Sequence, residues 1–600
     1  MTDQTCCLVL SSTYRDSVAL MHLSRALEGL PDVRQAAVMM GTPHNKTLLR
    51  EAGLLTAEGE TAGVNDLLIC VKAGTPAATE RAVQEARQRL ANSRAVIDDT
   101  GEMAPRTLET ALRRMPDANL AFISIPGQYA RHEVLKALKH GLHVFLFSDH
   151  VELEAEEQIK QLAAQQGLLV MGPDCGTAIL GGIPLGFANS VSRGPVGLIS
   201  ASGTGLQEVI CLLARQGIGI SQAIGVGGRD LHRRIGGCSM RGALQALADD
   251  ADTQVIVLIS KPPDAEIAAC LAREATQCGK PCVLAFLGDE TRSDPRAALH
   301  SVSTLEDAAL VAGALIRGET PVPSGLQELL TELVQPLEAA RASLRSGQQV
   351  FRALYCGGTL AYEALWLLRR SLGKVDSNLD GTLSTSHQVG NEVIDLGAEE
   401  FTIGRPHPMI DPTVRSEQLI ETARKPEVAV VLCDVILGWG AHPDPAAGLA
   451  AAWKEAQSIV NADGRNLVGI ATVCGTPGDP QGYEEQCRVL REHGIILAES
   501  NAQAVRFVAS VFGVSPEAER ARSYTDGMAP VPPAPACDTT LPEVSVHLAP
   551  LFASGPRVIN LGLELFATQL SACGGSVVHV DWRPPAGGNE RLASLLERLR

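Results

Sequence analysis

The feature that most constrains the fold is an internal repeat at a fixed offset of 155 residues. The matched pairs are Gly203-Thr204 with Gly358-Thr359, Glu208 with Glu363, and Leu212-Leu213 with Leu367-Leu368. In both copies an apolar strand runs into a turn of small residues, and a helix follows at once. Later elements agree in pattern, since residues 299–316 resemble residues 495–512. The repeat predicts two duplicated flavodoxin-like domains.

The rest of the chain alternates strands and helices in the rhythm of parallel, doubly wound sheets. We therefore predict a multidomain α/β protein. Its expected parts are a small N-terminal α/β sandwich (1–97), a Rossmann-like unit (98–193), the first repeat (194–318), a linker (319–349), the second repeat (350–515), a Pro-rich linker (516–545) and a C-terminal βαβ segment (546–600). The last segment is too short to bury its own sheet, so it must dock on another surface.

Charge and composition exclude several classes of partner. The formal net charge is −17 and aromatic residues make up 4% of the chain, which argues against nucleic acid and anionic membranes as partners. The longest apolar run, residues 428–440, contains Asp434 and is too short to span a membrane. The start of the chain does not have the pattern of a signal peptide and no CxxC pair occurs, so we expect a cytoplasmic protein with reduced thiols, Cys6 and Cys7 being small core residues.

The two turns of small residues are the best candidate for a binding site. A helix that begins directly after a turn offers unpaired backbone N–H groups and its positive end to an anion. If the repeats face each other about a pseudo-twofold axis, one phosphate can lie between the two helix ends. The expected phosphate-binding residues are Ser202, Gly203, Thr204, Gly357, Gly358 and Thr359. The alternative is that each glycine only makes a tight strand-to-helix turn.

Several segments resemble known families. Residues 171–176 (MGPDCG) and 197–204 (GLISASGT) resemble the α subunit of succinyl-CoA synthetase, and the second repeat resembles the carboxy-terminal domain of its β subunit. The chain as far as about residue 515 is more similar still to the FdrA family. That resemblance rests on residues 358–360 (GTL), 395–412 (DLGAEEFTIGRPHPMIDP) and 438–443 (GWGAHP), and the tail around 580–588 resembles the start of a protein usually encoded beside FdrA. The resemblance implies a Rossmann-like domain of the CoA-binding type and two flavodoxin-like domains of the succinyl-CoA-synthetase type.

The chain departs from succinyl-CoA synthetase at the residues that carry its phosphoryl group. That enzyme has its phosphorylated histidine in a GHAGA loop, whereas this chain continues there as Asp289 to Pro295 with no histidine, and His300 follows farther on. The glutamate that supports the phosphohistidine falls near Lys261, a cation suited to an oxyanion. No ATP-grasp domain and no Walker pattern occur in the sequence.

The FdrA resemblance implies a specific reaction. It predicts a transferase, a component of oxamate carbamoyltransferase, in which phosphate cleaves oxalurate to oxamate and carbamoyl phosphate during allantoin degradation. The implied partners are other carbamoyltransferase subunits, with a carbamate kinase acting downstream, and no cofactor is expected. One alternative is an acyl-CoA synthetase that uses CoA and borrows a nucleotide domain from a partner. The other is a non-catalytic scaffold subunit.

Four further residues are candidates for the chemistry. Arg405 and His407, in a loop stiffened by prolines, can bind a carboxylate and protonate a leaving amide, or can be a surface Arg and a capping His. Lys261 is a candidate for oxyanion binding or a solvated loop residue. His442, close to Asp444, could contact the substrate, but without a third ligand at suitable spacing we expect no metal site. Cys175 invites interpretation as a nucleophile, but we expect it to be part of a turn.

Overall fold

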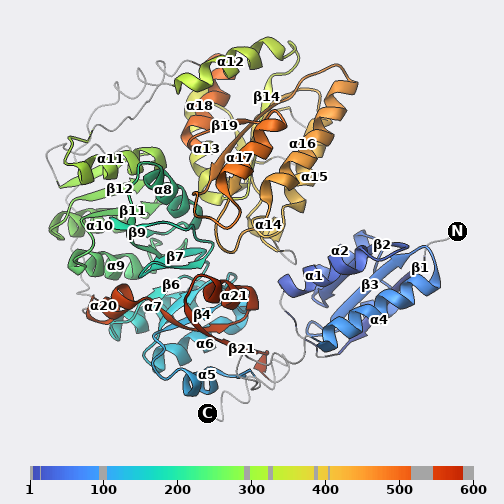
Figure 1. Ribbon diagram of the computed structural model, residues 1–600, viewed down its shortest axis with the longest axis horizontal. Helices are drawn as coiled ribbons and strands as arrows, with labels where there is room; N and C mark the ends of the chain where they lie inside the picture. Colours follow the sequence, from blue (N-terminus) through green and yellow to red (C-terminus); the bar gives the residue numbers. More distant parts are fainter. Residues whose placement is uncertain are drawn as a thin grey trace.

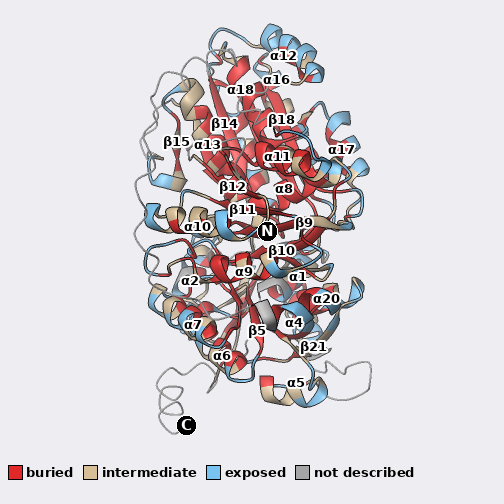
Figure 2. Cartoon of the chain, turned by 90° about the vertical axis from the view of Figure 1, so that its left-hand side faces the viewer, coloured by how far each residue is buried: buried red, intermediate tan, exposed pale blue. Residues whose placement is uncertain are grey.

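The computed structural model describes residues 4–11, 13, 15, 17–92, 104–288, 298–321, 329–383, 389–402, 406–514 and 545–585. These residues form four sheets, each covered by helices (Figure 1). The central strands are buried, whereas the outward faces of the surrounding helices are exposed (Figure 2). This confirms the predicted multidomain α/β class. No helix in the described ranges is long and apolar enough to cross a membrane.

The N-terminal unit is a three-stranded antiparallel sheet of order β1-β3-β2, with helices on both faces. Its central strand β3 is apolar except for Lys72, because alternate residues serve two cores: Leu67, Ile69 and Val71 face α1 and α4, whereas Leu68 and Cys70 face the opposite side. Its elements are β1 (Gln4–Leu10), α1 (Ser17–Glu28), β2 (Val33–Met40), α2 (Pro43–Glu51), α3 (Ala57–Glu60), β3 (Leu67–Ala73) and α4 (Pro76–Asn92).

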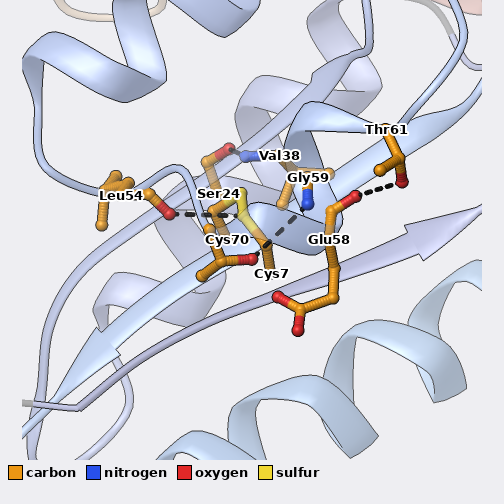
Figure 3. Close-up of a disulfide and its surroundings, with 9 residues drawn as sticks. Cys7, Ser24, Val38, Leu54, Glu58, Gly59, Thr61 and Cys70 are labelled. Carbon is orange, nitrogen blue, oxygen red and sulfur yellow. Dashed lines mark hydrogen bonds between the residues drawn. A yellow bond between two sulfur atoms is a disulfide. The ribbon is translucent and has the colours of Figure 1, made fainter.

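A disulfide in this unit departs from the expected reduced thiols. Cys7 of β1 and Cys70 of β3 are directly opposite each other in the antiparallel register and are joined by a disulfide (Figure 3). Cys7 is buried, as expected of a core residue, but its sulfur is bonded to that of Cys70. The sequence alone could not show this pair, because the two cysteines lie 63 residues apart.

The second sheet is parallel and has the order β21-β20-β4-β5-β6, so the C-terminal segment completes a sheet begun some 440 residues earlier. Strand β20 pairs with β4, which would otherwise be an edge strand. The segment that needed a docking surface thus docks on its own chain. The elements are α5 (Leu108–Arg114), β4 (Leu120–Ile123), α6 (Gly127–Lys139), β5 (His143–Leu146), α7 (Leu153–Gln165), β6 (Val170–Met171), α20 (Ser545–Ser554), β20 (Arg557–Leu561), α21 (Glu564–Ala572) and β21 (Ser576–Val580).

The third sheet contains the first repeat. Five parallel strands have the order β13-β12-β11-β9-β10, and the hairpin β7-β8 is added beside β10. The elements are β7 (Thr177–Leu180), β8 (Ile183–Gly186), β9 (Arg193–Ser200), α8 (Gly203–Arg215), β10 (Ile220–Gly225), α9 (Cys238–Asp249), β11 (Val255–Ser260), α10 (Ala265–Gln277), β12 (Cys282–Phe286), β13 (Leu299–Val302) and α11 (Leu305–Arg317).

The fourth sheet is parallel, with the order β15-β16-β14-β17-β18-β19. In the first repeat the first strand, β9, lies between the second and third strands, followed by the fourth and fifth, which is the flavodoxin-like order. The second repeat has the same order over β16, β14, β17, β18 and β19, and the short strand β15 is added beside β16. The elements are α12 (Thr331–Ser343), β14 (Val350–Tyr355), α13 (Gly358–Leu372), β15 (Asp376–Ser377), η1 (Asn378–Asp380), β16 (Glu392–Asp395), α14 (Glu399–Thr402), α15 (Thr413–Ala423), β17 (Val428–Ile436), α16 (Pro445–Ala462), β18 (Val468–Cys474), α17 (Tyr483–Glu492), β19 (Ile496–Ala498) and α18 (Asn501–Val511).

The two repeats exchange helix caps. Glu208 of α8 accepts a hydrogen bond from the backbone N–H of Asn501, the first residue of α18 (3.0 Å). Its counterpart Glu363 of α13 accepts one from the N–H of Leu305, the first residue of α11 (2.7 Å). Each buried carboxylate therefore caps a helix of the other repeat. This reciprocity is the pseudo-twofold relation predicted from the offset, and it brings the starts of α8 and α13 together.

Candidate functional site

A cavity of about 1370 Å³ lies where the units meet. Its walls are the carboxyl ends of parallel strands, which is where open α/β sheets bind ligands. The walls include residues 124–128 after β4, 147–150 after β5, 174–177 after β6, 200–204 at the end of β9, Lys261 after β11, Cys356, Gly358 and Thr359 after β14, Asp395 and Gly397 at the end of β16, parts of α1 and β2, and Leu563 of the C-terminal segment.

The two predicted turns meet at this cavity. Ser202 caps α8 by accepting a hydrogen bond from the N–H of Gly205 (3.0 Å), and its own hydroxyl donates to Thr359 Oγ1 (2.5 Å). In return the backbone N–H of Thr359 donates to Thr204 Oγ1 (3.4 Å). The hydroxyl groups thus tie the turns together. The first N–H groups of α8 and α13, at Gly203 and Gly358, have no partner within their helices.

Gly357 has a different place from the other predicted turn residues. Its N–H donates to Asp434 Oδ2 (2.7 Å), and the N–H of Cys356 donates to Asp434 Oδ1 (2.8 Å). Asp434 is fully buried at the end of β17, with Arg415 Nη1 3.8 Å from its Oδ1. Gly357 is not among the described residues that line the cavity. Asp434 therefore fixes the conformation of the second turn. The sequence signal for this role of Asp434 was a carboxylate inside an otherwise apolar strand.

Lys261 is the cation of the site. Its Nζ lies 3.6 Å from the point where a Cβ on Gly358 would stand, at the start of α13. Lys261 is half-buried, and within the described part of the chain it donates no hydrogen bond and forms no ion pair, although its charge acts on Asp174 and Asp395. An ammonium group left without an acceptor beside two helix N-termini favours an anionic ligand. We call Lys261, Gly203, Thr204, Gly358 and Thr359 the anion site.

Two carboxyl groups that we did not single out adjoin the anion site. Burial raises the pKa of Asp395 to about 6, although Lys261 opposes the shift. Burial also raises the pKa of Asp174 to about 6, and Asp149 adds to the rise. Asp174 has a left-handed φ of 55° and lines the cavity, where its side chain is accessible to solvent. Asp174 follows β6 and Asp395 ends β16, so in segments 171–176 and 395–412 an acidic residue at the end of a buried strand was the available signal.

His407 lies in the cavity wall as a neutral donor. Its Nδ1 accepts a hydrogen bond from the N–H of Met409 (3.2 Å), so the ring proton is on Nε2. Burial lowers the pKa of His407 to about 4, which leaves the ring uncharged at neutral pH. Its Nε2 is 2.8 Å from the position of a Cβ on Gly397, close to Asp395. At neutral pH this histidine offers a hydrogen bond and not a labile proton.

The other predicted residues either fall outside the described residues or do not line the cavity. Arg405 and the segment from Asp289 to Pro295 fall outside the described residues. His442 accepts a hydrogen bond from the N–H of Asp444 (3.0 Å) and is not among the residues that line the cavity. His300 is buried in β13, also away from the cavity walls.

Cys175 is buried in the turn after β6, and Asp444 caps a helix. Burial raises the pKa of the Cys175 thiol to about 12, so Cys175 is not a thiolate at neutral pH. Asp444 caps α16 by accepting a hydrogen bond from the N–H of Ala447 (3.2 Å). Within the described ranges no three His, Cys, Asp or Glu side chains are placed to hold a metal ion.

Family models match three parts of the chain. A model described as CoA-ligase matches residues 354–511, and one described as a succinyl-CoA ligase-like flavodoxin domain matches residues 193–333. Residues 1–105 match a model described as AllF, heavy metal-associated domain. The two repeats therefore carry the domains of CoA ligases.

Curated relatives give the same assignment. The Escherichia coli protein described as uncharacterized protein YahF is 41% identical over 504 residues, which covers 82% of this chain and 96% of YahF. The α subunit of an ADP-forming succinate–CoA ligase from Methanothermobacter thermautotrophicus is 30% identical over 36% of this chain and 68% of its own length. Subunit SauD of an ADP-forming sulfoacetate–CoA ligase from Bilophila wadsworthia is 27% identical over 36% of this chain and 71% of its own.

These matches correct the expected enzyme class. A transferase that forms carbamoyl phosphate was predicted, but the matched domains and the relatives with a described activity are CoA ligases. The prediction is wrong because it took the reaction from the FdrA resemblance, whereas the domain pair that surrounds the anion site is that of a ligase.

The heavy metal implied by the description of the N-terminal family model does not fit the residues present. A soft metal ion prefers thiolate ligands, but Cys7 and Cys70 are bonded to each other. The described residues offer no third ligand near them. The N-terminal unit instead contributes α1 and β2 to the wall of the cavity.

With its CoA-ligase repeats and its near-complete alignment to YahF, the chain belongs to the YahF family of succinyl-CoA-ligase-like proteins.

Proposed function

We propose that this chain is the subunit of an acid–CoA ligase that binds phosphate and handles the acyl phosphate, while a partner chain carries the nucleotide. The observation that carries the proposal is Lys261, whose ammonium group forms no hydrogen bond or ion pair with the described residues and lies beside the start of α13, which meets the start of α8. A phosphate placed there would receive N–H groups from both repeats and the ammonium group of Lys261. The finer assignment to the FdrA family is part of this proposal.

The reaction we propose exchanges an acyl group between a CoA thioester and phosphate. In this reaction the anion site would hold phosphate and neutralise its charge, and the Nε2–H of His407 would donate to the acyl oxygen. Oriented N–H groups stabilise charge that develops on the acyl group without moving in the reaction. No phosphohistidine is needed on this chain, which agrees with the absence of histidine between Asp289 and Pro295.

The residues after β4 and β5 suit CoA. Pro126 gives the start of α6 no side-chain cap, so the N–H of Gly127 and its neighbours remain available to a phosphate group at the cavity wall. Ser124 and Ser148 would complete the binding surface. When bound, CoA supplies the thiol that gives up or accepts the acyl group. The partner with the nucleotide domain is inferred from the absence of an ATP-grasp or Walker pattern in this sequence.

Calorimetry and a thiol assay test the proposal. The purified chain, with any nucleotide-binding chain that copurifies with it, is titrated with phosphate and then incubated with a panel of acyl-CoA thioesters. We expect phosphate to bind and to increase thiol release, with an acyl phosphate signal in the ³¹P NMR spectrum. Lys261→Met should abolish both effects, whereas Lys374→Met, a change to a side chain that is 77% exposed, should not. Absence of phosphate binding would refute the proposal.

A labelling experiment separates this mechanism from that of a phosphohistidine ligase. With labelled ATP and the nucleotide partner, we expect no acid-labile phosphate on this chain. Labelling of any of its histidines would show that a phosphoenzyme forms and that direct attack by phosphate is the wrong mechanism.

A further inference from the structure

A carboxylate oxygen faces the anion site. Asp395 is only 6% exposed. Its Oδ1 accepts a hydrogen bond from the N–H of Gly397 (2.9 Å). Its Oδ2 has no hydrogen-bond partner in the described structure and lies 2.6 Å from the position of a Cβ on Gly358, the first residue of α13. The side chain lines the cavity, so this unpaired oxygen is directed at the place where an anion would receive the helix N–H groups.

This arrangement conflicts with the binding of an anion that has no proton. An oxygen of an ionised carboxylate and an oxygen of a fully deprotonated anion both accept hydrogen bonds and repel each other. Lys261 offsets part of this repulsion, but Asp174, which also lines the cavity and whose charge repels that of Asp395, adds a second carboxyl group. The conflict disappears if the anion has a hydroxyl group, because that hydroxyl can donate to Asp395 Oδ2.

We propose that the anion site selects oxyanions that carry a proton, such as hydrogen phosphate and arsenate, over sulfate, and that Asp395 Oδ2 is the selecting acceptor. The inference rests on the proposed phosphate site and deepens it. Sulfate has no proton at neutral pH, so it offers only acceptors to an oxygen that is also an acceptor. No bond is made or broken, because the site discriminates by hydrogen bonding alone.

The protonation state of Asp395 gives the selectivity a pH dependence. Burial raises its pKa to about 6, Lys261 lowers it, and Asp434 and Glu400 raise it. Asp174 and the Nε2 of His407 also adjoin it. Above pH 6 the ionised carboxylate accepts only and favours phosphate. Below pH 6 the protonated carboxyl group can donate to sulfate as well, so the discrimination should decline as the pH falls.

Isothermal titration of the full chain with phosphate, arsenate and sulfate tests the inference. At pH 7.5 we expect phosphate and arsenate to bind at least about tenfold more tightly than sulfate, the effect of one hydrogen bond to a charged group. Asp395→Asn keeps an acceptor for the Gly397 N–H and replaces Oδ2 by a donor. This variant should bind phosphate more weakly and sulfate more tightly than the wild type, so that the ratio of the two dissociation constants comes close to one.

Asp149→Asn is the matched control, since Asp149 also lines the cavity but pairs with His150 Nδ1 (2.9 Å). Asp149→Asn should change the dissociation constants of phosphate and sulfate in the same direction and leave their ratio unchanged. Thermal melting and circular dichroism verify that each variant is folded. Equal binding of phosphate and sulfate by the wild type, or an unchanged ratio in Asp395→Asn, would overturn the inference and leave the proposed function standing. If neither anion binds, the proposed function itself fails.

Discussion

Gly358→Ala isolates the contact between the start of α13 and Asp395. The added Cβ would lie 2.6 Å from Asp395 Oδ2, whereas ordinary contacts begin at 3.4 Å. The carboxylate would therefore have to retreat by about 0.8 Å, a distance set by van der Waals contact. Gly358 does not have a positive φ, so alanine adds no backbone strain there.

The expected loss of phosphate affinity follows from the displacement of Asp395. Moving Asp395 withdraws its Oδ2, the proposed acceptor for the hydroxyl group of phosphate, and places a methyl group beside Lys261. The loss of a hydrogen bond to a charged group costs about 1.5–3 kcal/mol, so the dissociation constant for phosphate should rise about 10- to 100-fold. Stability should change little, since alanine is up to about 1 kcal/mol more favourable than glycine in a helix.

Calorimetric titration with phosphate at pH 7.5 and thermal melting measure the two effects separately. Gly203→Ala, the equivalent change in the first repeat, is the control for helix starts in general, because its nearest atom is Thr177 Oγ1 at 3.3 Å. We expect Gly203→Ala to lower the affinity for phosphate only a few-fold. Gly347→Ala, with no atom within 4 Å, should have no effect. If Gly358→Ala binds phosphate like the wild type, the anion site is placed wrongly.

Further changes test the assembly of the units. Ending the chain at residue 544 removes β20 and exposes the edge of β4, so we expect aggregation on size exclusion and recovery when residues 545–600 are added as a separate peptide. Glu363→Ala leaves the Leu305 N–H without its acceptor and should lower the free energy of unfolding by about 3 kcal/mol in urea titrations, whereas Glu363→Gln retains an acceptor and should cost less. Cys175 should resist alkylation at pH 8 in the folded chain, because burial raises the pKa of its thiol to about 12; rapid labelling would refute the burial argument.

The sequence was sufficient for the fold of the two repeats because their pattern is local. A strand, a turn of small residues and a helix recur around Gly203 and Gly358, and the order of such units in a doubly wound sheet follows from few rules. The pairing of β20 with β4 could not be predicted, since a short βαβ segment shows that it needs a neighbouring strand but not which one. The disulfide between Cys7 and Cys70 was missed for the same reason.

The site was predicted in part. The facing turns and Lys261 could be found, because glycine turns at a repeat and a cation at a strand end are visible in the sequence. Asp395 and Asp174 were within the quoted motifs but unassigned, since their effect on an anion depends on which strand ends meet across the domain interface. The protonation state of His407 also could not be predicted, because burial by distant segments determines it.

His143 gives the attachment of the C-terminal segment a pH dependence. Its Nδ1 accepts from the N–H of Leu169 (3.0 Å) and its Nε2 bonds to the carbonyl of His547 (3.1 Å), so the neutral ring joins β5 to α20. Burial lowers its pKa to about 4, against about 6.5 in an unfolded chain. A base whose pKa is lowered by folding stabilises the folded state above the unfolded pKa, and this contribution disappears as the pH falls from about 6.5 to 4, a loss of roughly 3 kcal/mol. Limited proteolysis across this range should release the C-terminal segment earlier from the wild type than from His143→Gln, which keeps both hydrogen bonds without titrating. Parallel curves for the two proteins would mean that His143 does not control the attachment.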